Sequence, residues 1–594
     1  MTTVIVILSL HAITVHSDNL PSVTSNWLIP ITVVLAYLAL ACVSGGLIVC
    51  GFFFAHSSRE SALARDFSAV SAAVLAIIAG VIAVLDGMHG EIRSEWLVAS
   101  GLAAITALIC FLASGRAGLV VCGALTLVLT VVISASSPES RSDSSDLSAR
   151  LLHGGSAVVW VGTLTVLMVV FSVVDTERLT GIAGVQLRRY AALALSCFIG
   201  VVLSGVVLAA DRLSAGTFLL TPYGVLILVK TLIVLVLGVF AYGRRRVDGS
   251  RYRSRLRLRS WFLVGELLLL SAASGVAVLL PIANEFSSPS SQSGSLPQSP
   301  SDLLTGHALP QQPTAVSWVF GGTVDALWLY ICAAALVWYG VGVLRLRRLG
   351  DRWPYRYTLA WVGGVVLLFF ATNGGVRVYA TYLFSARVVM MMILATLVPL
   401  LLVGGAPMRL AARTLRSRID DSWGAREWVR AVSRSRLRWV FASPTTATVL
   451  FAVSLWAFAV GPLLRPSVTN VLWGEWMTFH LLIAGVLAVG ALSVSRAAYA
   501  RKPLIVRLIP LAIAAGFFAG VGMVLMNYGG LFVADWFGAM GRTWGASPSA
   551  DQRYAAYPVW ILGGFWVIVL LVGEVLRHSP RHQLRGRLSE SVTG

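Results

Sequence analysis

The feature that most constrains this chain is a series of apolar runs, each long enough to cross a bilayer as a helix. About fifteen such runs recur between residues 27 and 577. They predict an all-α polytopic membrane protein with about fifteen transmembrane helices in two bundles. The predicted spans are 27–54, 66–86, 96–113, 117–135, 150–173, 187–210, 220–242, 260–282, 314–344, 356–373, 383–404, 442–463, 474–496, 506–527 and 556–577.

The charge of the chain fits a membrane protein better than a nucleic-acid-binding one. Hydrophobic residues make up 57% of the chain and charged residues only 12%, which excludes an ordinary soluble protein. The formal net charge of +20 would suggest nucleic acid in a soluble chain. Here it follows from basic loops on the cytoplasmic side of a membrane. We therefore expect the lipid bilayer, and no nucleic acid, as a partner.

The basic loops also predict an orientation. The segments 243–260, 345–356, 409–430 and 495–507 are rich in arginine, whereas 283–313 contains no lysine or arginine. This alternation predicts an N-terminus outside and a C-terminus inside the plasma (inner) membrane. Residues 1–20 are apolar but lack a basic start, so a signal segment and a mis-assigned start both remain open.

A segment rich in Ser, Pro and Gln divides the chain. Its composition is typical of a flexible, partly extended extracytoplasmic linker. We expect about eight helices before it and about seven after it. The predicted domains are 1–282, the linker 283–313, 314–578 and a basic cytoplasmic tail at 579–594.

Ionisable side chains within the apolar runs of the first half are candidate functional residues, because charge inside a membrane is costly. Lys230 and Glu266 lie on helices that are neighbours in sequence, so a structural ion pair between them is favoured. His153 begins a helix near the predicted outer face. It either forms an ordinary hydrogen bond or binds copper together with Met88 and His89 of an outer loop.

The second half contains an apolar span, Leu383–Pro407, with one arginine and three consecutive methionines. Arg387, Met390 and Met391 have the spacing of one helix face. Methionine thioethers are soft ligands for Cu(I), but they are also common packing residues. Other candidates near the predicted outer side are Met477, His480, Met523 and Met526.

The six cysteines, by contrast, predict no site. All lie in apolar stretches, and no C-x-x-C occurs. This pattern indicates neither a thiol redox motif nor a cysteine metal cage. We interpret the cysteines as small buried hydrophobic residues.

The first half resembles a known family over about 150–282. LLHGGSAVVWVGTL is followed by TPYGVLILVK, an arginine-rich loop and GELLLLSAASGVAVLLP. In this order the pieces look like the copper-resistance D (CopD) family of membrane proteins. The helix with His153, Trp160 and Gly162 carries the best match. The resemblance implies copper uptake across the inner membrane.

The second half resembles the CtaG-type cytochrome c oxidase assembly family over about 314–578. The chain as a whole thus looks like an actinobacterial fusion of the two families. The pieces that match in order are Asp325 and Trp328, LRRLGDRWP, LVGGAP at 402–407, EWMTFHLLIAG around His480, GFFAGVGMVLM and DQRYAAYPVW at 551–560.

This half departs from the family at its expected histidines. The family usually carries paired histidines where Arg387 and Met391 stand, and others where Gly474 and Phe518 stand. His480 alone is retained, which puts an imidazole copper or zinc site in doubt. The positive charge of Arg387 could take the place of the missing metal's charge, and three carboxylates are candidate partners for it. They are Asp325, Glu475 and Asp551.

The predicted function is membrane copper handling, with copper imported and delivered for cytochrome c oxidase assembly by ligand exchange along His and Met residues. Cu(I) is the favoured ion, and oxidase subunits or other assembly factors are the implied partners. Two alternatives remain. One is a degenerate assembly or interaction protein that binds no metal, and the other is a transporter of another solute. An enzyme is not expected, because the chain has no phosphate loop, nucleophile motif or carboxylate pair.

Overall fold

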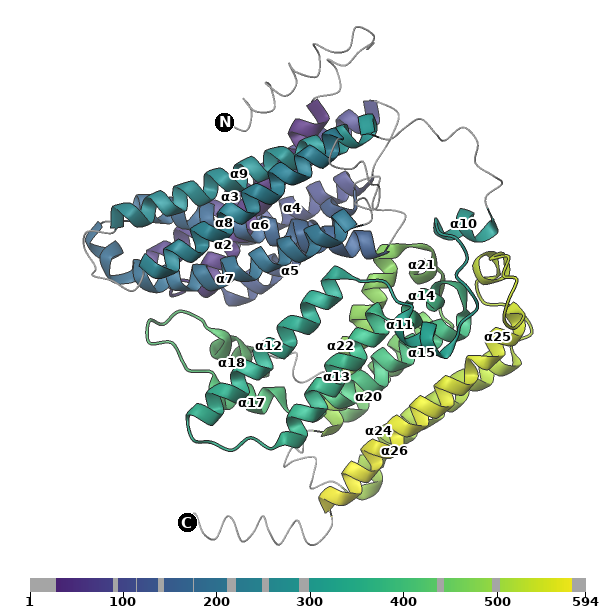
Figure 1. The fold of residues 1–594 in the computed structure, drawn as a ribbon. Coiled ribbons are helices and arrows are strands. Elements are labelled where there is room, and N and C mark those ends of the chain that lie inside the picture. The colour runs from purple at the N-terminus through teal and green to yellow at the C-terminus, as the bar shows by residue number, and fades with distance from the viewer. Residues whose placement is uncertain are drawn as a thin grey trace, which may run out of the picture. The chain divides into compact units, whose positions relative to one another are not determined.

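The computed structural model describes residues 28–88, 94–113, 115–136, 144–174, 176–210, 221–247, 256–287, 299–434, 443–493 and 503–578. Within these ranges the secondary-structure elements are all helices, apart from a single β-bridge (Figure 1). Thirteen described helices are long and apolar enough to cross a membrane, and two shorter apolar helices occur at Trp261–Ala277 and Pro444–Ala459. The chain is therefore an all-α polytopic membrane protein, as predicted.

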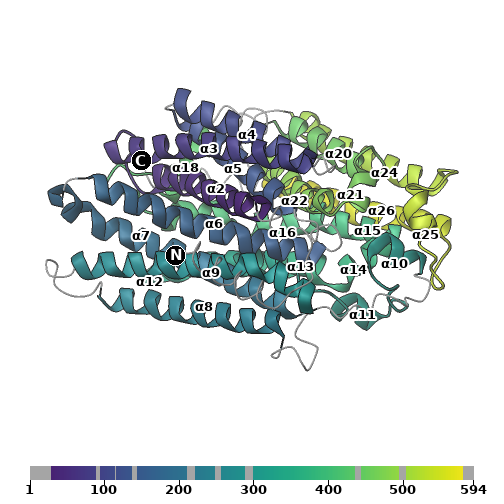
Figure 2. The same ribbon diagram turned by 90° about the horizontal axis from the view of Figure 1, so that it is seen from above.

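The chain folds into two compact units that divide between Ser295 and Leu296, with Ser417–Gly424 assigned to the first unit. In the first unit, several long helices run alongside one another (Figure 2). Its helices are α2 (Leu28–Phe52), α3 (Arg59–Met88), α4 (Ser94–Leu112), α5 (Arg116–Ala135), α6 (Ser144–Val173), α7 (Thr176–Ala210), α8 (Pro222–Val247) and α9 (Leu256–Ser287).

Glycines let α2 and α6 of the first unit touch at the backbone. A Cβ atom at Gly45 would lie 2.0 Å from the backbone carbon of Gly162. A Cβ atom at Gly162 would lie 1.7 Å from the carbonyl oxygen of Ala41. Only small residues permit this approach, which is a common way for helices to associate in a membrane. The close approach holds α6 in place, and α6 carries His153 and Trp160.

The segment Ser417–Gly424 belongs to the first unit through polar contacts. Arg418 donates to the carbonyl oxygen of Phe52, and Ala55 forms a single β-bridge with Ser422. Arg189 pairs with the Asp420 carboxylate at 2.8 Å. Burial raises the pKa of Asp420, but the Ser422 hydrogen bond and the Arg189 charge outweigh burial and hold that pKa below its ordinary value.

The second unit combines long helices with short helices at their ends (Figure 1). Its long helices are α12 (Ala326–Arg348), α13 (Tyr355–Asn373), α20 (Pro444–Ala459), α22 (Val471–Ser493), α24 (Leu504–Asn527) and α26 (Ala556–His578). Its shorter elements are α10 (Pro300–Thr305), α11 (Ala315–Phe320), α14 (Gly375–Tyr382), α15 (Phe384–Met392), η4 (Ile393–Leu397), α16 (Val398–Gly404), α17 (Pro407–Thr414), α18 (Ala425–Arg434), α21 (Leu464–Thr469), η5 (Ala534–Gly538) and α25 (Pro548–Tyr554).

The predicted span 383–404 forms one membrane-crossing rod with a π-helical turn inside it. The turn η4 separates α15 from α16 and ends just before Pro399. Proline has no amide hydrogen and clashes with the carbonyl four residues earlier, and a π-turn relieves this conflict. Gly485 of α22 packs against the turn, because a Cβ atom there would lie 2.3 Å from the Ala395 oxygen.

One prediction at the start of the second unit is wrong. The predicted helix 314–344 is broken, because α11 ends at Phe320 and α12 begins at Ala326 after the N-cap residue Asp325. Within the predicted linker 283–313, the residues described from 299 onward include the short helix α10, and Gln311 accepts a hydrogen bond from the Tyr379 hydroxyl.

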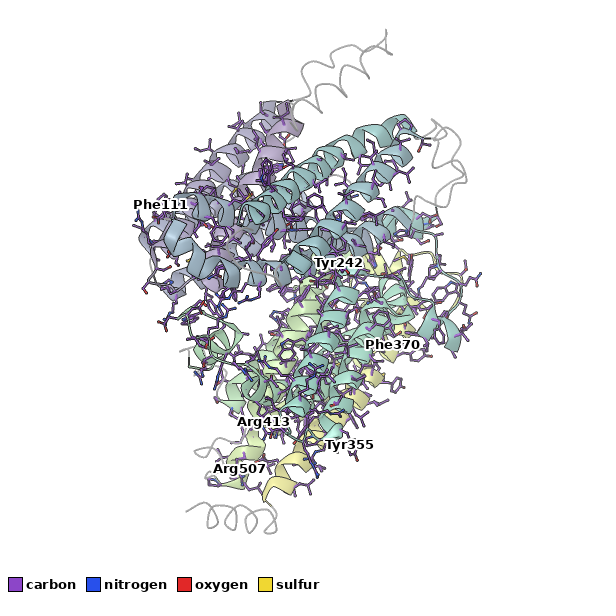
Figure 3. The ribbon with its side chains drawn as sticks, turned by 60° about the vertical axis from the view of Figure 1, so that its left-hand side comes forward. Phe111, Tyr242, Tyr355, Phe370, Arg413 and Arg507 are labelled. Carbon is purple, nitrogen blue, oxygen red and sulfur yellow. The ribbon has the colours of Figure 1, made fainter. Side chains whose placement is uncertain are left out.

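Large apolar side chains cover the outside of both units. Phe111 in the first unit is 60% exposed, and Tyr355 in the second unit is 77% exposed (Figure 3). Such exposure would be unfavourable in water but matches a surface that faces lipid. By contrast, the buried Arg507 of the second unit pairs with Glu574 at 3.1 Å. The charge of Arg507 is therefore matched by an opposite charge inside the unit.

Candidate functional site

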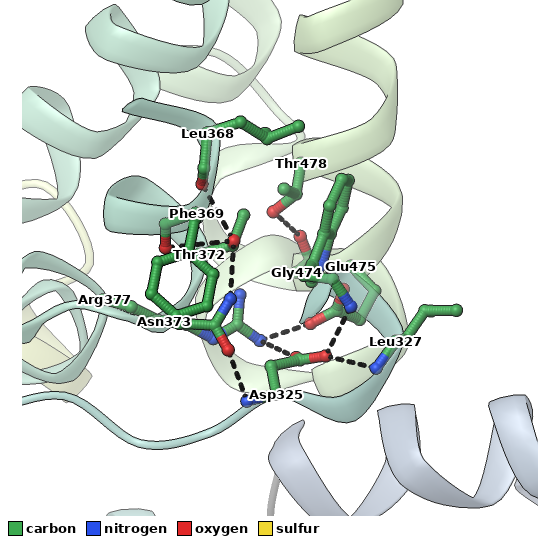
Figure 4. Close-up of polar contacts among 11 residues, drawn as sticks. Asp325, Leu327, Leu368, Phe369, Thr372, Asn373, Arg377, Gly474, Glu475 and Thr478 are labelled. Carbon is green, nitrogen blue, oxygen red and sulfur yellow. Dashed lines mark hydrogen bonds and ion pairs between the residues drawn. The ribbon is translucent and has the colours of Figure 1, made fainter. Parts of the chain in front are cut away.

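A buried polar network in the second unit begins at the N-terminus of α12. The Asp325 side chain accepts hydrogen bonds from the amides of Leu327 and Trp328, each at 3.1 Å. These amides have no partner within the helix, so an aspartate is a suitable cap. The Asp325 amide in turn donates to the Asn373 side chain at 2.7 Å. Asp325 is thereby fixed, fully buried, where α12 meets the end of α13 (Figure 4).

Arg377 links this cap to α22. It donates to the Glu475 carboxylate and lies 3.5 Å from the Asp325 carboxylate (Figure 4). The other oxygen of Glu475 accepts a hydrogen bond from the indole of Trp328 at 2.9 Å. Both carboxylates are buried, so the cation of Arg377 is what offsets their charge. One arginine therefore joins α12, α14 and α22.

Arg387 of α15 is buried, with 7% of its surface exposed, but it is held differently. Its Nη2 atom donates to the carbonyl oxygen and, at 2.9 Å, to the hydroxyl of Ser467. The same atom lies 3.6 Å from the Met477 sulfur. Its Nε atom has no hydrogen-bond partner. Among the described residues no carboxylate pairs with Arg387, so its charge is offset only by dipoles.

These residues surround a cavity of about 360 Å³. Arg387, Met390 and Met477 line it together with Glu475 and Arg377. A cavity of this size is at the small end of the range for organic ligands. Arg387 brings a positive charge to the wall beside Met477, whereas Arg377 is shared by Glu475 and the neighbouring Asp325, so the charges of these four groups sum to zero. Next to Met477 the fixed guanidinium disfavours a bare cation.

The structure does not bring the predicted second-half copper ligands together. Met390 and Met477 share the cavity, whereas Met391 is buried in the apolar core. His480 lies between aromatic rings, with centroids 5.6 Å from Phe458 and 5.5 Å from Trp476. Met523 also lies apart, since it is 59% exposed on the outer surface, and Met526 packs partly buried at the core.

The donor set in this unit therefore does not fit a metal ion. Within the described part of the chain, no three His, Cys, Asp or Glu side chains converge on one point. The sulfur of Met477 lies 3.6 Å from the fixed guanidinium of Arg387, which raises the cost of placing a second cation there.

The predicted partners of Arg387 are all engaged elsewhere. Asp325 and Glu475 bind Arg377, as described above. Asp551 caps α15 instead, accepting from the Phe384 amide at 2.8 Å and from the Ser385 hydroxyl. The prediction that Arg387 pairs with one of these carboxylates is therefore wrong. The cap nevertheless matters, because it fixes the start of the helix that carries Arg387.

In the first unit, His153 forms polar contacts with two helices. Its Nδ1 atom lies 3.1 Å from the Ser204 hydroxyl of α7, and its Nε2 atom lies 3.4 Å from the Lys230 ammonium of α8. The predicted ion pair between Lys230 and Glu266 is therefore wrong. His89 and the side chain of Met88 lie outside the described residues.

Glu266 of α9 accepts two hydrogen bonds in a second polar cluster of this unit. The Trp160 indole donates to its Oε1 atom at 2.9 Å, and the Tyr190 hydroxyl donates to the same atom at 2.8 Å. All three side chains are buried. Trp160 is two helical turns beyond His153 on α6, so both clusters use the same face of that helix.

Sequence reasoning missed two of the residues that build the cavity. Arg377 lies between the predicted spans 356–373 and 383–404, and Ser467 lies between 442–463 and 474–496. The charge of Arg377 between the apolar runs of α13 and α15 was an available signal. Ser467 offered none, because its role depends on α21, a six-residue helix formed between two long ones.

Two family models match this chain. Residues 337–579 match the cytochrome c oxidase caa3 assembly factor (Caa3_CtaG), and residues 185–280 match copper resistance protein D. The chain carries a CopD-type domain followed by a CtaG-type domain. The fusion inferred from the motifs is confirmed. The segment that matches the CopD model comprises α8 and most of α7 and α9. The segment that matches the CtaG model includes Arg377, Arg387 and Glu475.

Curated relatives of the chain are mycobacterial. The uncharacterized protein ML1998 of Mycobacterium leprae is 31% identical over 276 residues, which is 46% of this chain and 41% of the relative. The uncharacterized protein Mb0105 of Mycobacterium bovis is 32% identical over 280 residues, which is 46% of this chain and 42% of the relative. The chain thus spans about two fifths of the length of these relatives. No solved structure matches it.

The four positions at which the CtaG resemblance implies histidines lie in two different places in the structure. Arg387 and Gly474 line the same cavity. Met391 lies in the core, and Phe518 is buried with its ring 6.1 Å from that of Trp566. The cavity therefore occupies part of the place where a metal site is expected, but it holds an arginine there.

Proposed function

We propose that this protein handles copper in the plasma membrane, importing it and delivering it for the assembly of cytochrome c oxidase. The observation that carries the proposal is the presence of a CopD-type and a CtaG-type domain in one chain. The first family is named for copper resistance and the second for oxidase assembly. A single membrane chain with both domains suits a path from copper entry to a copper-dependent enzyme.

The structure supports a division of labour between the two domains. The CtaG-type domain contains the arginine-lined cavity and lacks an imidazole cluster among its described residues. Its contribution is then to engage oxidase subunits or other assembly factors, with the lipid bilayer around it. Copper handling falls to the first unit, where Ser204, His153 and Lys230 form a polar cluster between helices.

A second candidate function follows from the same cavity. Arg387 stands at an expected ligand position and has no carboxylate partner among the described residues. This favours a protein that has kept the assembly role and lost metal handling altogether. The two candidates differ in whether added copper can restore the oxidase in cells that lack the protein.

An experiment on cells that lack the chain separates the two. At limiting copper we expect assembled cytochrome c oxidase to fall several-fold, and the intact gene to restore it. If the protein supplies copper, excess copper in the medium should also restore the oxidase. An oxidase defect that excess copper leaves unchanged would contradict the copper-supply role and support the interaction role. Unchanged oxidase at limiting copper would contradict both.

A further inference from the structure

Two buried cysteines meet between α4 and α5 of the first unit. The sulfur atoms of Cys110 and Cys122 lie 3.4 Å apart, and each residue is at most 3% exposed. The two helices pack directly against one another. No sequence motif predicts this contact, because the residues are twelve positions apart on separate helices. Both lie outside the segments that the family models match.

Other donor groups gather at the same point. Cys110 and Cys122 line a small cavity together with Cys50, His56 and Arg65. Its volume is about 10 Å³, close to that of one water-sized probe, so it admits a single ion or water and no organic ligand. The remaining lining residues are apolar or small. They are Leu47, Ala113, Gly115, Gly118 and Leu119.

We propose that Cys110 and Cys122 form a thiolate site for Cu(I), with Cys50 or His56 available as a further donor. The proposal rests on the copper-handling function above and deepens it. Thiolates are soft ligands that select Cu(I) over harder ions. With metal–sulfur bonds of about 2.3 Å, two thiolates on one ion lie at most about 4.6 Å apart, so the 3.4 Å separation is within reach.

The charge balance of binding is simple. Each thiol releases one proton, and each sulfur forms one bond to the monovalent ion, so two protons leave for every Cu(I) bound. The bis-thiolate complex carries one negative charge. Arg65 lines the same cavity and pairs with the Asp66 carboxylate at 3.3 Å, so its positive charge is shared between that carboxylate and the complex. No oxidant or reductant is needed.

The short separation also indicates how the site is completed. Two sulfurs 3.4 Å apart subtend a strongly bent angle at a metal ion, which leaves one side of the ion open. Cys50 approaches from α2 and at present contacts the Ser61 hydroxyl at 3.1 Å. The described donors do not yet form a three-ligand cluster, so a side-chain rotation of Cys50 or His56 accompanies binding.

The location of the site matches a role in copper transfer. Cys110 lies in the last turn of α4, and Cys50 lies in the last turn of α2. His56 is in the short connection from α2 to α3 and is only partly buried. The cavity is therefore near the end of the helices, where an ion can be exchanged with a carrier. The arginine-rich loops predict that this end faces the cytoplasm.

The test is Cu(I) binding by the purified full chain under anaerobic, reducing conditions with a competing Cu(I) chelator. We expect Cys110→Ser and Cys122→Ser each to lose about one equivalent of bound copper relative to the unmodified chain. Cys197→Ser and Cys332→Ser are matched controls, because these cysteines are also buried but do not line the cavity. Equal copper in all five proteins would overturn the proposal.

A measurement on the unmodified chain guards against variants that fail to fold. Titration with Cu(I) should produce a thiolate-to-copper absorption band in the ultraviolet and release about two protons per ion. Binding without the band or the protons would overturn the thiolate site. A positive result here with normal oxidase in cells lacking the chain would leave the site intact and contradict the proposed function instead.

Discussion

Replacing Arg377 with methionine is expected to destabilise the second unit by about 3–5 kcal/mol, since it leaves a buried charge without its partner. Arg377 is the cation that Asp325 and Glu475 share, and both carboxylates are at least 95% buried. Methionine keeps much of the side-chain volume but supplies no charge. The loss is measured as the change in free energy of unfolding of the purified chain in detergent.

Two matched variants test the reason for that loss. Arg465→Met breaks an ion pair with Asp535 in which both side chains are more than half exposed, so it should leave stability unchanged. Arg387→Met removes a buried arginine that has no carboxylate partner among the described residues, so it should cost far less than Arg377→Met. Equal losses for Arg377 and Arg387 would contradict the assigned ion pairs.

Replacing Glu266 with leucine is expected to cost about 1–3 kcal/mol for each buried donor that loses its acceptor. Trp160 and Tyr190 both donate to Glu266, and they bring together α6, α7 and α9. The change should lower the thermal unfolding midpoint of the first unit and move the tryptophan fluorescence of the chain.

Glu266→Gln is the control for this prediction. Its side-chain oxygen still accepts the hydrogen bonds at nearly the same position, so most of the stability should remain. If glutamine destabilised the unit as strongly as leucine, the negative charge and not the hydrogen bonds would be what Glu266 supplies. A leucine variant as stable as the unmodified chain would show that the cluster contributes little to the fold.

Most of the helices could be predicted from hydropathy, because a membrane-crossing helix is specified by a long local run of apolar residues. The predicted span 187–210, for example, lies within α7, and 506–527 lies within α24. The failure at 314–344 has a local cause. Gly321 and Gly322 lie in the break, and Asp325 starts a new helix as its cap.

Side-chain partners were predicted far less well, because neighbours in sequence were taken as partners in space. Lys230 and Glu266 are on consecutive helices, yet Lys230 contacts His153 from two helices earlier. The cysteine pair shows the converse, because two residues that no motif links are in contact. Cys110 and Cys122 follow no sequence motif, and only the packing of α4 on α5 places their sulfurs together.

The chemistry of the second unit was predicted only in part. The resemblance indicated that Arg387 replaces an expected ligand, and the structure places it in a cavity with Gly474, another such position. The partner of Arg387 depends on Arg377, because Arg377 pairs with Asp325 and Glu475, two of the carboxylates that were candidates for Arg387. A buried arginine held by Ser467 is thus a consequence of competition between two cations.

The most direct test of the copper-handling proposal is Cu(I) accumulation in sealed vesicles that contain the purified full chain. We expect uptake above that of vesicles without protein, saturable in Cu(I) and inhibited by Ag(I), another soft monovalent ion. Uptake equal to that of protein-free vesicles, with the chain shown to be folded and inserted, would contradict the proposal.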